Sequence, residues 1–481
     1  MKRNKNKQIM TGLDFICLIP LLIISVAPIL IMVTITFVRN YTVIAAFSFL
    51  AFLLAFLSVS YVMPYAPHAI APLFIFDTYS YLFTGIILFG CMLVTILSYV
   101  YFRRQSVVKE EYFIILFVSA LGASILAAAN HFVTFFLGLE TLSVTLYILI
   151  GYLRQRDQSV EAGVKYLILA SVSAAILLFG MALVYTGTGT MNFNELSSYF
   201  VTAKAVSPFI MVGAGMIIVG VGFKLAVAPF HMWTPDVYQG APAPVTTYIA
   251  TISKGAVIAV ILRFFVDIRG HQNHALVVII TVIAILSMFI GNFLALRQTN
   301  MKRLLAYSSI AHLGYLLIML LAGTSAGIQA AIFYLIAYII TSLGTFGVIA
   351  ILSTVQRDAD SFDDYRGLFW RRPWIAIVFT LTLLSLAGIP ITAGFIAKFY
   401  LVLAGVGSGL WLLAFVLIVN SVIGLYYYLR VVATMFQSTG KENVPALPFL
   451  GHVVLAVIAA VILLLGVIPE WLLDIIGKFS L

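Results

Sequence analysis

Long runs of apolar residues dominate this chain, and they constrain its fold more than any other feature. A helix that crosses the hydrocarbon core of a bilayer needs about 20 apolar residues. Fourteen runs approach or exceed this length, near residues 13–36, 41–62, 78–101, 112–129, 131–152, 162–186, 208–230, 243–266, 275–296, 304–323, 327–354, 374–403, 409–435 and 449–469. Only 9% of the 481 residues are charged, against about 25% in soluble domains. The sequence therefore predicts an all-α polytopic membrane protein with about 14 transmembrane helices.

The apolar runs take up nearly the whole chain, so residues 1–481 form a single predicted membrane domain. No connecting segment is long enough to fold as a separate domain. The first run is longer than the core of a signal peptide and no soluble domain follows it, so we expect no cleavable signal.

The net charge of +10 comes mainly from lysines and arginines in connecting loops. In a membrane protein such residues orient the spans, because basic loops stay in the cytoplasm. Most of them follow odd-numbered runs, which predicts both termini on the outer face and gives no reason to expect a nucleic-acid partner. The exceptions are Lys204, Arg263, Arg269 and Lys478 in outer loops, and the amino-terminal tail with Lys2, Arg3, Lys5 and Lys7.

The two cysteines, Cys17 and Cys91, lie far apart in apolar runs, without a CxxC motif or a clustered His/Cys set. This excludes the usual iron–sulfur and zinc patterns. The glycines between Gly213 and Gly222 are better explained by close helix packing than by nucleotide binding. We therefore expect no metal and no cofactor on this chain, and any redox chemistry on other chains.

A lysine stands inside an apolar run that prolines then interrupt, in the segment FKLAVAPFHMWTPDVYQGAPAPV at residues 223–245. An ionisable side chain at mid-membrane is costly and marks a functional site by default. Pro229 removes a backbone donor and frees carbonyls near Ala226. A broken helix beside Lys224 indicates an ion path. The alternative is a lysine that reaches toward the surface near a kinked helix end.

Four ionisable residues lie deep within predicted spans, namely Glu140, Lys224, Lys254 and Lys398. Glu140 is about ten residues and Lys254 about eleven residues into its span, near half-depth of a roughly 30 Å core. Burial favours the uncharged form of lysine and glutamate, whereas pairing favours the charged form, so a Glu140–Lys224 pair that opens and closes would switch proton affinity. The four residues predict a proton relay across the membrane plane. The alternative is a static ion pair, against which the two additional lysines without matching acids count.

Three further residues are candidate auxiliary groups of this path. His231, beside the helix break, and His312, in SSIAHLGY, could pass protons between lysines, since histidine titrates near physiological pH. A hydrogen-bonded core histidine is the alternative for each. Lys165, at the start of its span, is a candidate proton entry point or an ordinary loop-side lysine.

A second broken helix is predicted at residues 385–400, SLAGIPITAGFIAKFY, where Pro390 precedes Lys398. The spans then divide into two five-helix units, residues 112–266 and residues 275–435. Because five is odd, the second unit inserts with the opposite orientation. Broken helices in inverted repeats are typical of transport sites.

Five segments carry a family resemblance: EAGVKYLILAS, GFKLAVAPFHMWTPDVYQGAPAPV, RQTNMKRLLAYSSIAHLGYLL, YRGLFWRRP and SLAGIPITAGFIAKFY. Together they resemble subunit N of bacterial respiratory complex I, the NADH:quinone oxidoreductase, within the superfamily of antiporter-like membrane subunits. The related subunit M is similar but carries a glutamate where Lys398 stands. The resemblance implies that Glu140, Lys224, Lys254 and Lys398 form the polar axis for proton translocation, assisted by Lys165, His231 and His312.

The resemblance also implies the setting of the protein. We expect it in the bacterial inner membrane, beside other membrane subunits of complex I that include antiporter-like neighbours. NADH, FMN, iron–sulfur clusters and quinone are expected on other subunits, whose electron transfer drives proton pumping here. Two other classes of function stay open: a subunit of a multi-subunit cation/proton antiporter, and a scaffold whose charges only hold neighbours together.

Overall fold

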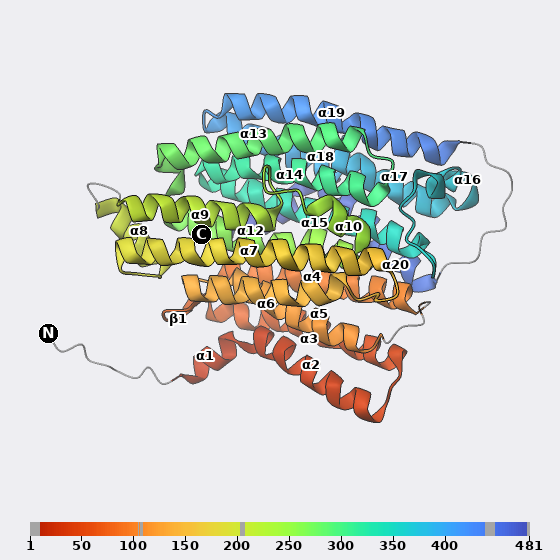
Figure 1. Ribbon diagram of the computed structural model, residues 1–481, viewed down its shortest axis with the longest axis horizontal. Coiled ribbons are helices and arrows are strands. Elements are labelled where there is room, and N and C mark those ends of the chain that lie inside the picture. Colours follow the sequence, from red (N-terminus) through yellow and green to blue (C-terminus); the bar gives the residue numbers. More distant parts are fainter. Residues whose placement is uncertain (1–9, 104, 106–108, 203–206, 438–447, 479–481) are drawn as a thin grey trace.

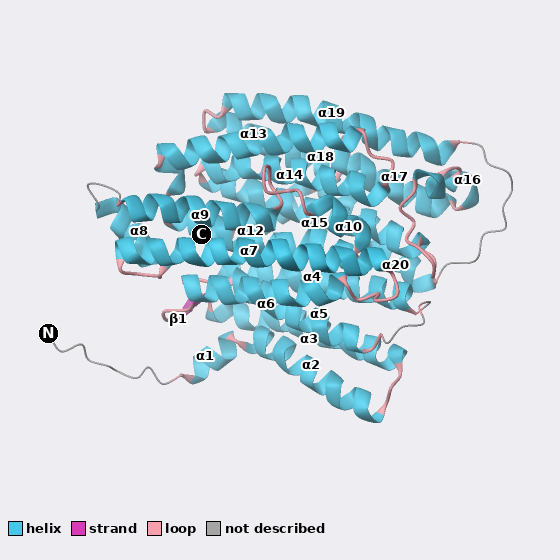
Figure 2. Cartoon of the chain, viewed as in Figure 1, coloured by secondary structure: helices cyan, strands magenta, loops and turns pink. Residues whose placement is uncertain are grey.

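The computed structural model describes residues 10–103, 105, 109–202, 207–437 and 448–478. Its helices run roughly parallel, from α2 at the bottom of Figure 1 to α19 at the top. Figure 2 shows that nearly all the regular structure is helical. The exception is a short antiparallel hairpin formed by β1 (His68–Ile70) and β2 (Phe74–Phe76).

The helices follow one another closely along the chain. The amino-terminal group is α1 (Gly12–Cys17), α2 (Ile19–Phe37), α3 (Tyr41–Val62), η1 (Met63–Tyr65) and α4 (Thr78–Phe102). The next group is α5 (Glu111–Ala127), α6 (Phe132–Ile150), α7 (Asp157–Thr188), α8 (Phe193–Thr202), α9 (Pro208–Leu225), α10 (Thr234–Gly240), α11 (Ala243–Tyr248), η2 (Ile249–Ser253) and α12 (Lys254–Asp267). The last group is η3 (Gly270–Gln272), α13 (His274–Leu296), α14 (Met301–Ala322), α15 (Ser325–Leu352), η4 (Phe362–Tyr365), α16 (Leu368–Arg371), α17 (Pro373–Ala387), α18 (Ala393–Gly407), α19 (Trp411–Phe436), α20 (Phe449–Val467) and α21 (Pro469–Gly477).

The predicted membrane spans are confirmed. Within the described ranges, 12 helices are long and apolar enough to cross a membrane, and α5, α17 and α18 are shorter apolar helices. The protein is therefore an all-helical, multi-pass membrane protein. The structure divides the run at 374–403 into α17 and α18, and it ends α9 at Leu225 within the run at 208–230. Each of the two units expected as inverted repeats contains one broken helix, and their inverted relation stays a prediction.

Four spans form the centre of the protein. In the most apolar window of each, 94% of residues are buried in α14 and in α15, 89% in the α11–α12 span and 78% in α4. The buried share of the corresponding window is only 33% for α2 and 39% for α13. A helix that is apolar all round and enclosed by other helices must satisfy its polar groups within the protein. The polar side chains of the central helices therefore have to find one another.

One basic residue expected in an outer loop lies inside a helix instead. Arg263 belongs to α12, is 3% exposed and donates from both terminal nitrogens to Asp77, at 2.7 and 2.8 Å. Its guanidinium also lies over the Tyr79 ring, 4.8 Å from the centroid. The prediction that Arg263 lies in a loop was wrong because its partner, Asp77, is 186 residues away and cannot be recognised from the local sequence. Lys204 and the basic tail, with Lys2, Arg3, Lys5 and Lys7, fall outside the described residues.

A buried ion cluster joins four parts of the chain. The carboxylate of Asp358, in the segment between α15 and η4, accepts hydrogen bonds from Lys302 on α14 at 2.6 Å, from Arg156 at 2.9 Å and from Tyr101 on α4 at 2.6 Å. Burial alone would raise the pKa of Asp358, but the Lys302 ammonium and the other two donors hold it below its usual value. The cluster fixes the ends of α4, α7 and α14 relative to one another.

We expect Asp358→Asn to lower the free energy of unfolding by about 3–5 kcal/mol, because Lys302 is left buried without its carboxylate. Thermal unfolding of the purified protein in detergent measures this. The matched control is Asp363→Asn, which removes the partner of exposed Arg366 and should cost no more than about 1 kcal/mol. Since the pKa of Asp358 is lowered in the folded state, the stabilisation is present above the unfolded value of about 3.9. It should disappear as the pH falls below that value. Equal effects of the two variants would rule out the buried cluster as a major stabilising element.

Candidate functional site

The first broken helix ends one residue after the deep lysine. The α9 helix stops at Leu225 because Ala226 adopts a left-handed backbone conformation, with φ of 60°. The groups freed by the break are partly satisfied: the Trp233 indole donates to the Phe223 carbonyl at 2.9 Å, and the Ala228 amide donates to the Ser287 hydroxyl at 2.9 Å. The break is therefore a defined, hydrogen-bonded turn. Neither Trp233 nor Ser287 was expected in this role.

Lys224 lies in the last turn of α9 and is 7% exposed. Its ammonium donates to the hydroxyl of Ser143 on α6 at 2.6 Å and lies 5.9 Å from the centroid of the Tyr166 ring. A cation in the last turn of a helix is also favoured by the helix dipole. The ammonium of the buried lysine is thus contacted by a hydroxyl, an aromatic face and a helix end.

Glu140 lies one turn before Ser143 on the same face of α6. It is half-buried, and its Oε1 atom is buried without a hydrogen-bond partner. Among the described residues, no ion pair joins Glu140 to Lys224. The expected pair is therefore separated in this structure, with Ser143 bonded to the lysine. A buried acceptor without a partner is costly, so Glu140 is poised to take up a proton or a new contact.

Lys254 follows a π-helical turn, η2, and is 1% exposed. Its ammonium donates to the Ser309 hydroxyl on α14 at 2.7 Å and lies 5.4 Å from the centroid of the Tyr238 ring. Single π-helical turns inside helices occur frequently at functional sites.

A small cavity joins the environments of Lys224 and Lys254. Its volume is about 10 Å³, and both lysines, Ser143, Tyr166 and Ser253 are among the residues that line it. This is close to the space that one water molecule needs, about 10–15 Å³. Polar groups on both sides could therefore be bridged by a single water.

The hydrogen-bond chain continues from Ser309 into the second half of the protein. Ser309 shares a 2.6 Å hydrogen bond with the hydroxyl of Tyr338 on α15. His312, one turn after Ser309 on α14, bonds through Nδ1 to Tyr334 at 2.6 Å and through Nε2 to Tyr428 at 3.2 Å. Tyr428 is also hydrogen-bonded to Ser308. His312 is therefore both a satisfied buried histidine and a member of a polar network.

Lys398 reaches back across the second break. It lies on α18 and is 9% exposed, and its ammonium donates to the carbonyls of Leu386 and Ala387, both at 2.9 Å. These are the last carbonyls of α17, which ends where Gly388 adopts a φ of 85°. A second cavity of about 10 Å³ lies between Lys398 and His312, with Tyr338 also in its wall. Both broken helices therefore place a lysine against a helix carboxyl end.

The two remaining candidates, Lys165 and His231, lie away from the connected groups around Lys224, Lys254, His312 and Lys398. Lys165 is exposed and forms ion pairs with Glu161 at 2.7 Å and with Asp236 at 3.1 Å. Asp236 also accepts from Arg303 at 2.6 Å, and a surface hollow of about 170 Å³ lies beside Lys165 and Asp236. His231 is buried in the turn after α9, its Nδ1 has no hydrogen-bond partner, and it lines neither small cavity. The structure thus joins His312 to the deep lysines but not His231 or Lys165.

Two broken helices and a line of buried lysines across the middle of the bundle define the class of antiporter-like membrane subunits. The chain belongs to the family described as NADH:quinone oxidoreductase/Mrp antiporter, transmembrane, which matches residues 129–424. Such subunits typically carry no redox cofactor. Among the described residues, no group of three or more His, Cys, Asp or Glu side chains could hold a metal ion.

Solved structures extend the likeness beyond the matched segment. A chain of respiratory complex I from Thermus thermophilus is 30% identical, with a TM-score of 0.82 over 95% of this chain and 98% of that chain. A chain of an archaeal membrane-bound sulfane sulfur reductase is 23% identical, with a TM-score of 0.84 over 97% and 96%. A chain of the Mrp complex from Dietzia is 19% identical, with a TM-score of 0.86 over 96% of each chain. The last two likenesses concern the fold alone.

Proposed function

We propose that this chain is subunit N of a bacterial NADH:quinone oxidoreductase and translocates protons across the inner membrane, with both termini on the outer face. One observation carries the proposal. Lys224, Lys254, His312 and Lys398 form one connected series through the middle of the bundle, linked by the hydroxyls of Ser143, Ser309 and Tyr338 and by two small cavities. Glu140 lies one turn before Ser143 on α6. The two cavities, of about 10 Å³ each, have room for a water molecule but are too small for a metabolite.

The chemistry of the line suits proton transfer. Lysine and glutamate exchange a proton at one atom, and serine and tyrosine hydroxyls can donate and accept at once. Each lysine ammonium meets neutral acceptors, so loss of its proton leaves no carboxylate without a partner. Reversible protonation at Lys224, Lys254 and Lys398 therefore needs only small rearrangements.

In this proposal the chain itself carries no redox group. NADH, FMN, iron–sulfur clusters and quinone lie on other subunits, and antiporter-like membrane subunits flank this one. Electron transfer on those subunits opens and closes the Glu140–Lys224 pair. The structure, in which the two side chains are separated, corresponds to the open state of the pair. Glu140 suits this role because it is half-buried and not enclosed by this chain.

Purification of the native protein in mild detergent, with identification of its companions, tests the assignment. We expect flavin and iron–sulfur subunits to copurify. A preparation that contains only small membrane subunits would instead support the second candidate, a subunit of an Mrp-type cation/proton antiporter. The matching family description, which names Mrp antiporters beside NADH:quinone oxidoreductase, supports this candidate.

Substitutions at Glu140 separate carboxylate chemistry from simple polarity. We expect Glu140→Gln to reduce proton pumping about tenfold or more, because glutamine fits the same space but cannot ionise. Glu140→Asp should retain part of the activity. Proton uptake by reconstituted proteoliposomes measures both.

The matched control is Glu161→Gln, because Glu161 is exposed and its partner Lys165 keeps a second carboxylate, Asp236. This variant should pump like wild type. If Glu140→Gln also behaves like wild type, Glu140 is structural and the relay begins at Lys224.

A further inference from the structure

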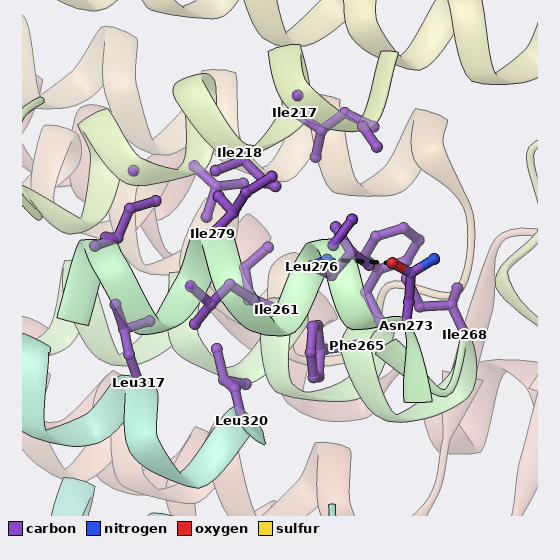
Figure 3. Close-up of a pocket in the computed structure, with 18 of the residues that line it drawn as sticks. Ile217, Ile218, Ile261, Phe265, Ile268, Asn273, Leu276, Ile279, Leu317 and Leu320 are labelled. Atoms are coloured by element: carbon purple, nitrogen blue, oxygen red, sulfur yellow. Dashed lines mark hydrogen bonds between the residues drawn. The ribbon is translucent and has the colours of Figure 1, made fainter. Parts of the chain in front are cut away.

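A large apolar groove lies between α9, α12, α13 and α14, apart from the line of lysines. Its volume is about 320 Å³, at the lower end of the roughly 300–1,000 Å³ of ligand sites. Figure 3 shows Ile217 and Ile218 of α9 facing Ile261 of α12, Ile279 of α13 and Leu317 of α14 across it. Among the described residues that line it, Asn273 alone is polar.

The groove runs from one membrane surface to mid-depth. Asn273, at the end of the η3 turn, marks its outer end, and Leu225, Val227 and Ile283 mark its inner end. Along α13, the nine residues from Ala275 to Ile283 are separated by eight helical rises and span about 12 Å. This is close to half of a roughly 30 Å hydrocarbon core. The groove therefore has the depth of one leaflet.

The outer end carries a positive charge at the level of lipid headgroups. Arg269 follows Ile268, which lines the groove, and it is exposed, as are Gln272 and His274 on either side of the groove-lining Asn273. The nearest acid in sequence, Asp267, is half-buried and interacts with Arg263. The Asn273 side chain caps α13 by accepting from the Leu276 amide. Arg269 is thus available to an anion at this surface.

We propose that this groove binds an acyl chain of a membrane phospholipid, whose phosphate lies at Arg269. An apolar lining excludes water, and a polypeptide segment would find almost no partners for its backbone polar groups there. An isoprenoid quinone would place an uncharged ring beside the arginine, whereas a phospholipid places an anion there. The end of the acyl chain would contact Leu225 and Val227, which flank Ala226 at the first helix break.

The test uses membranes from cells that produce the full chain, labelled with phosphatidylglycerol that carries a diazirine on one acyl chain. Gly215 lines the groove on α9, and a Cβ atom added there would meet nothing within 4 Å. Gly215→Leu should therefore fill the groove without strain. We expect labelled α9 and α13 peptides in the wild type and about a tenfold loss in Gly215→Leu, because each excluded methylene weakens binding about fourfold.

The matched control is Val212→Phe, one turn earlier on α9, at a residue that is 57% exposed and does not line the groove. Its labelling should equal that of the wild type. Arg269→Asn removes the charge, and asparagine tolerates the left-handed backbone found at this position, where φ is 51°. It should reduce labelling about fivefold.

Three results would overturn the proposal: unchanged labelling in Gly215→Leu, an equal loss in Val212→Phe, or no labelling of the wild type. Stronger labelling of the same peptides by a diazirine-bearing isoprenoid quinone would also overturn it. Gel filtration checks the folding of every variant. If Gly215→Leu does not fold, Arg269→Asn decides the question.

Discussion

Lys224→Ala should reduce proton pumping to about a tenth of the wild-type rate or less, because a positioned proton carrier contributes about 10²–10⁴-fold to a transfer step. Lys224 is the group that links Ser143 and the first cavity to the helix break. In the proposed complex, NADH oxidation by the peripheral subunits should persist with an artificial electron acceptor. Proton release per electron in proteoliposomes measures the effect.

The control for this prediction is Lys478→Ala, which removes an exposed lysine that follows α21. This variant should assemble and pump normally. Wild-type pumping per electron in Lys224→Ala would remove Lys224 from the path and leave a role in assembly. Equal amounts of assembled complex are needed for the comparison.

At Lys398 we expect both arginine and methionine to abolish coupled proton uptake. Arginine stays charged because its pKa is above about 12, and it can still donate to the Leu386 and Ala387 carbonyls. Methionine leaves both carbonyls without their donor, so it should also lower the free energy of unfolding by about 1–3 kcal/mol. Quinone-coupled proton uptake and thermal unfolding, measured on the same membranes, separate the two effects.

The scaffold hypothesis gives the opposite result for arginine. If Lys398 only holds the end of α17, Lys398→Arg should be nearly normal in both measurements. An arginine variant that pumps would show that this position supplies charge rather than proton exchange. The relay would then end at His312.

The sequence predicted the spans and the deep lysines because these are local signals. A run of about 20 apolar residues, or a lysine inside one, can be read without knowing what packs against it. The two breaks were predicted from proline, but the helices end earlier, at Leu225 and Ala387, where the next residue adopts a left-handed backbone conformation. Ala226 has no local signal for this conformation, since it lacks the freedom of a glycine.

The hydroxyl partners of the lysines could not be read from the sequence. Ser143 and Ser309 lie 81 and 55 residues from the lysines they bind. Hydroxyl groups in helices usually bond to their own backbone, as Thr247 does to Ala243, so their presence alone predicts nothing. A weak signal did exist. Ser143 lies three residues after Glu140, and His312 lies three residues after Ser309. The members of each pair therefore share one helix face.

The line of ionisable groups runs across the helices and not along them, and this determines which steps the membrane voltage can affect. Glu140 lies near the middle of α6 and His312 near the middle of α14, so both are close to half-depth. Moving one charge through the full membrane potential is worth about 2.3 kcal/mol per 100 mV. A proton that passes sideways between groups at one depth crosses almost none of that potential. In the proposed relay, the electrical work of the cycle therefore falls on the uptake and release steps at the two surfaces. The exchange between lysines should then proceed at the same rate in energised and de-energised membranes.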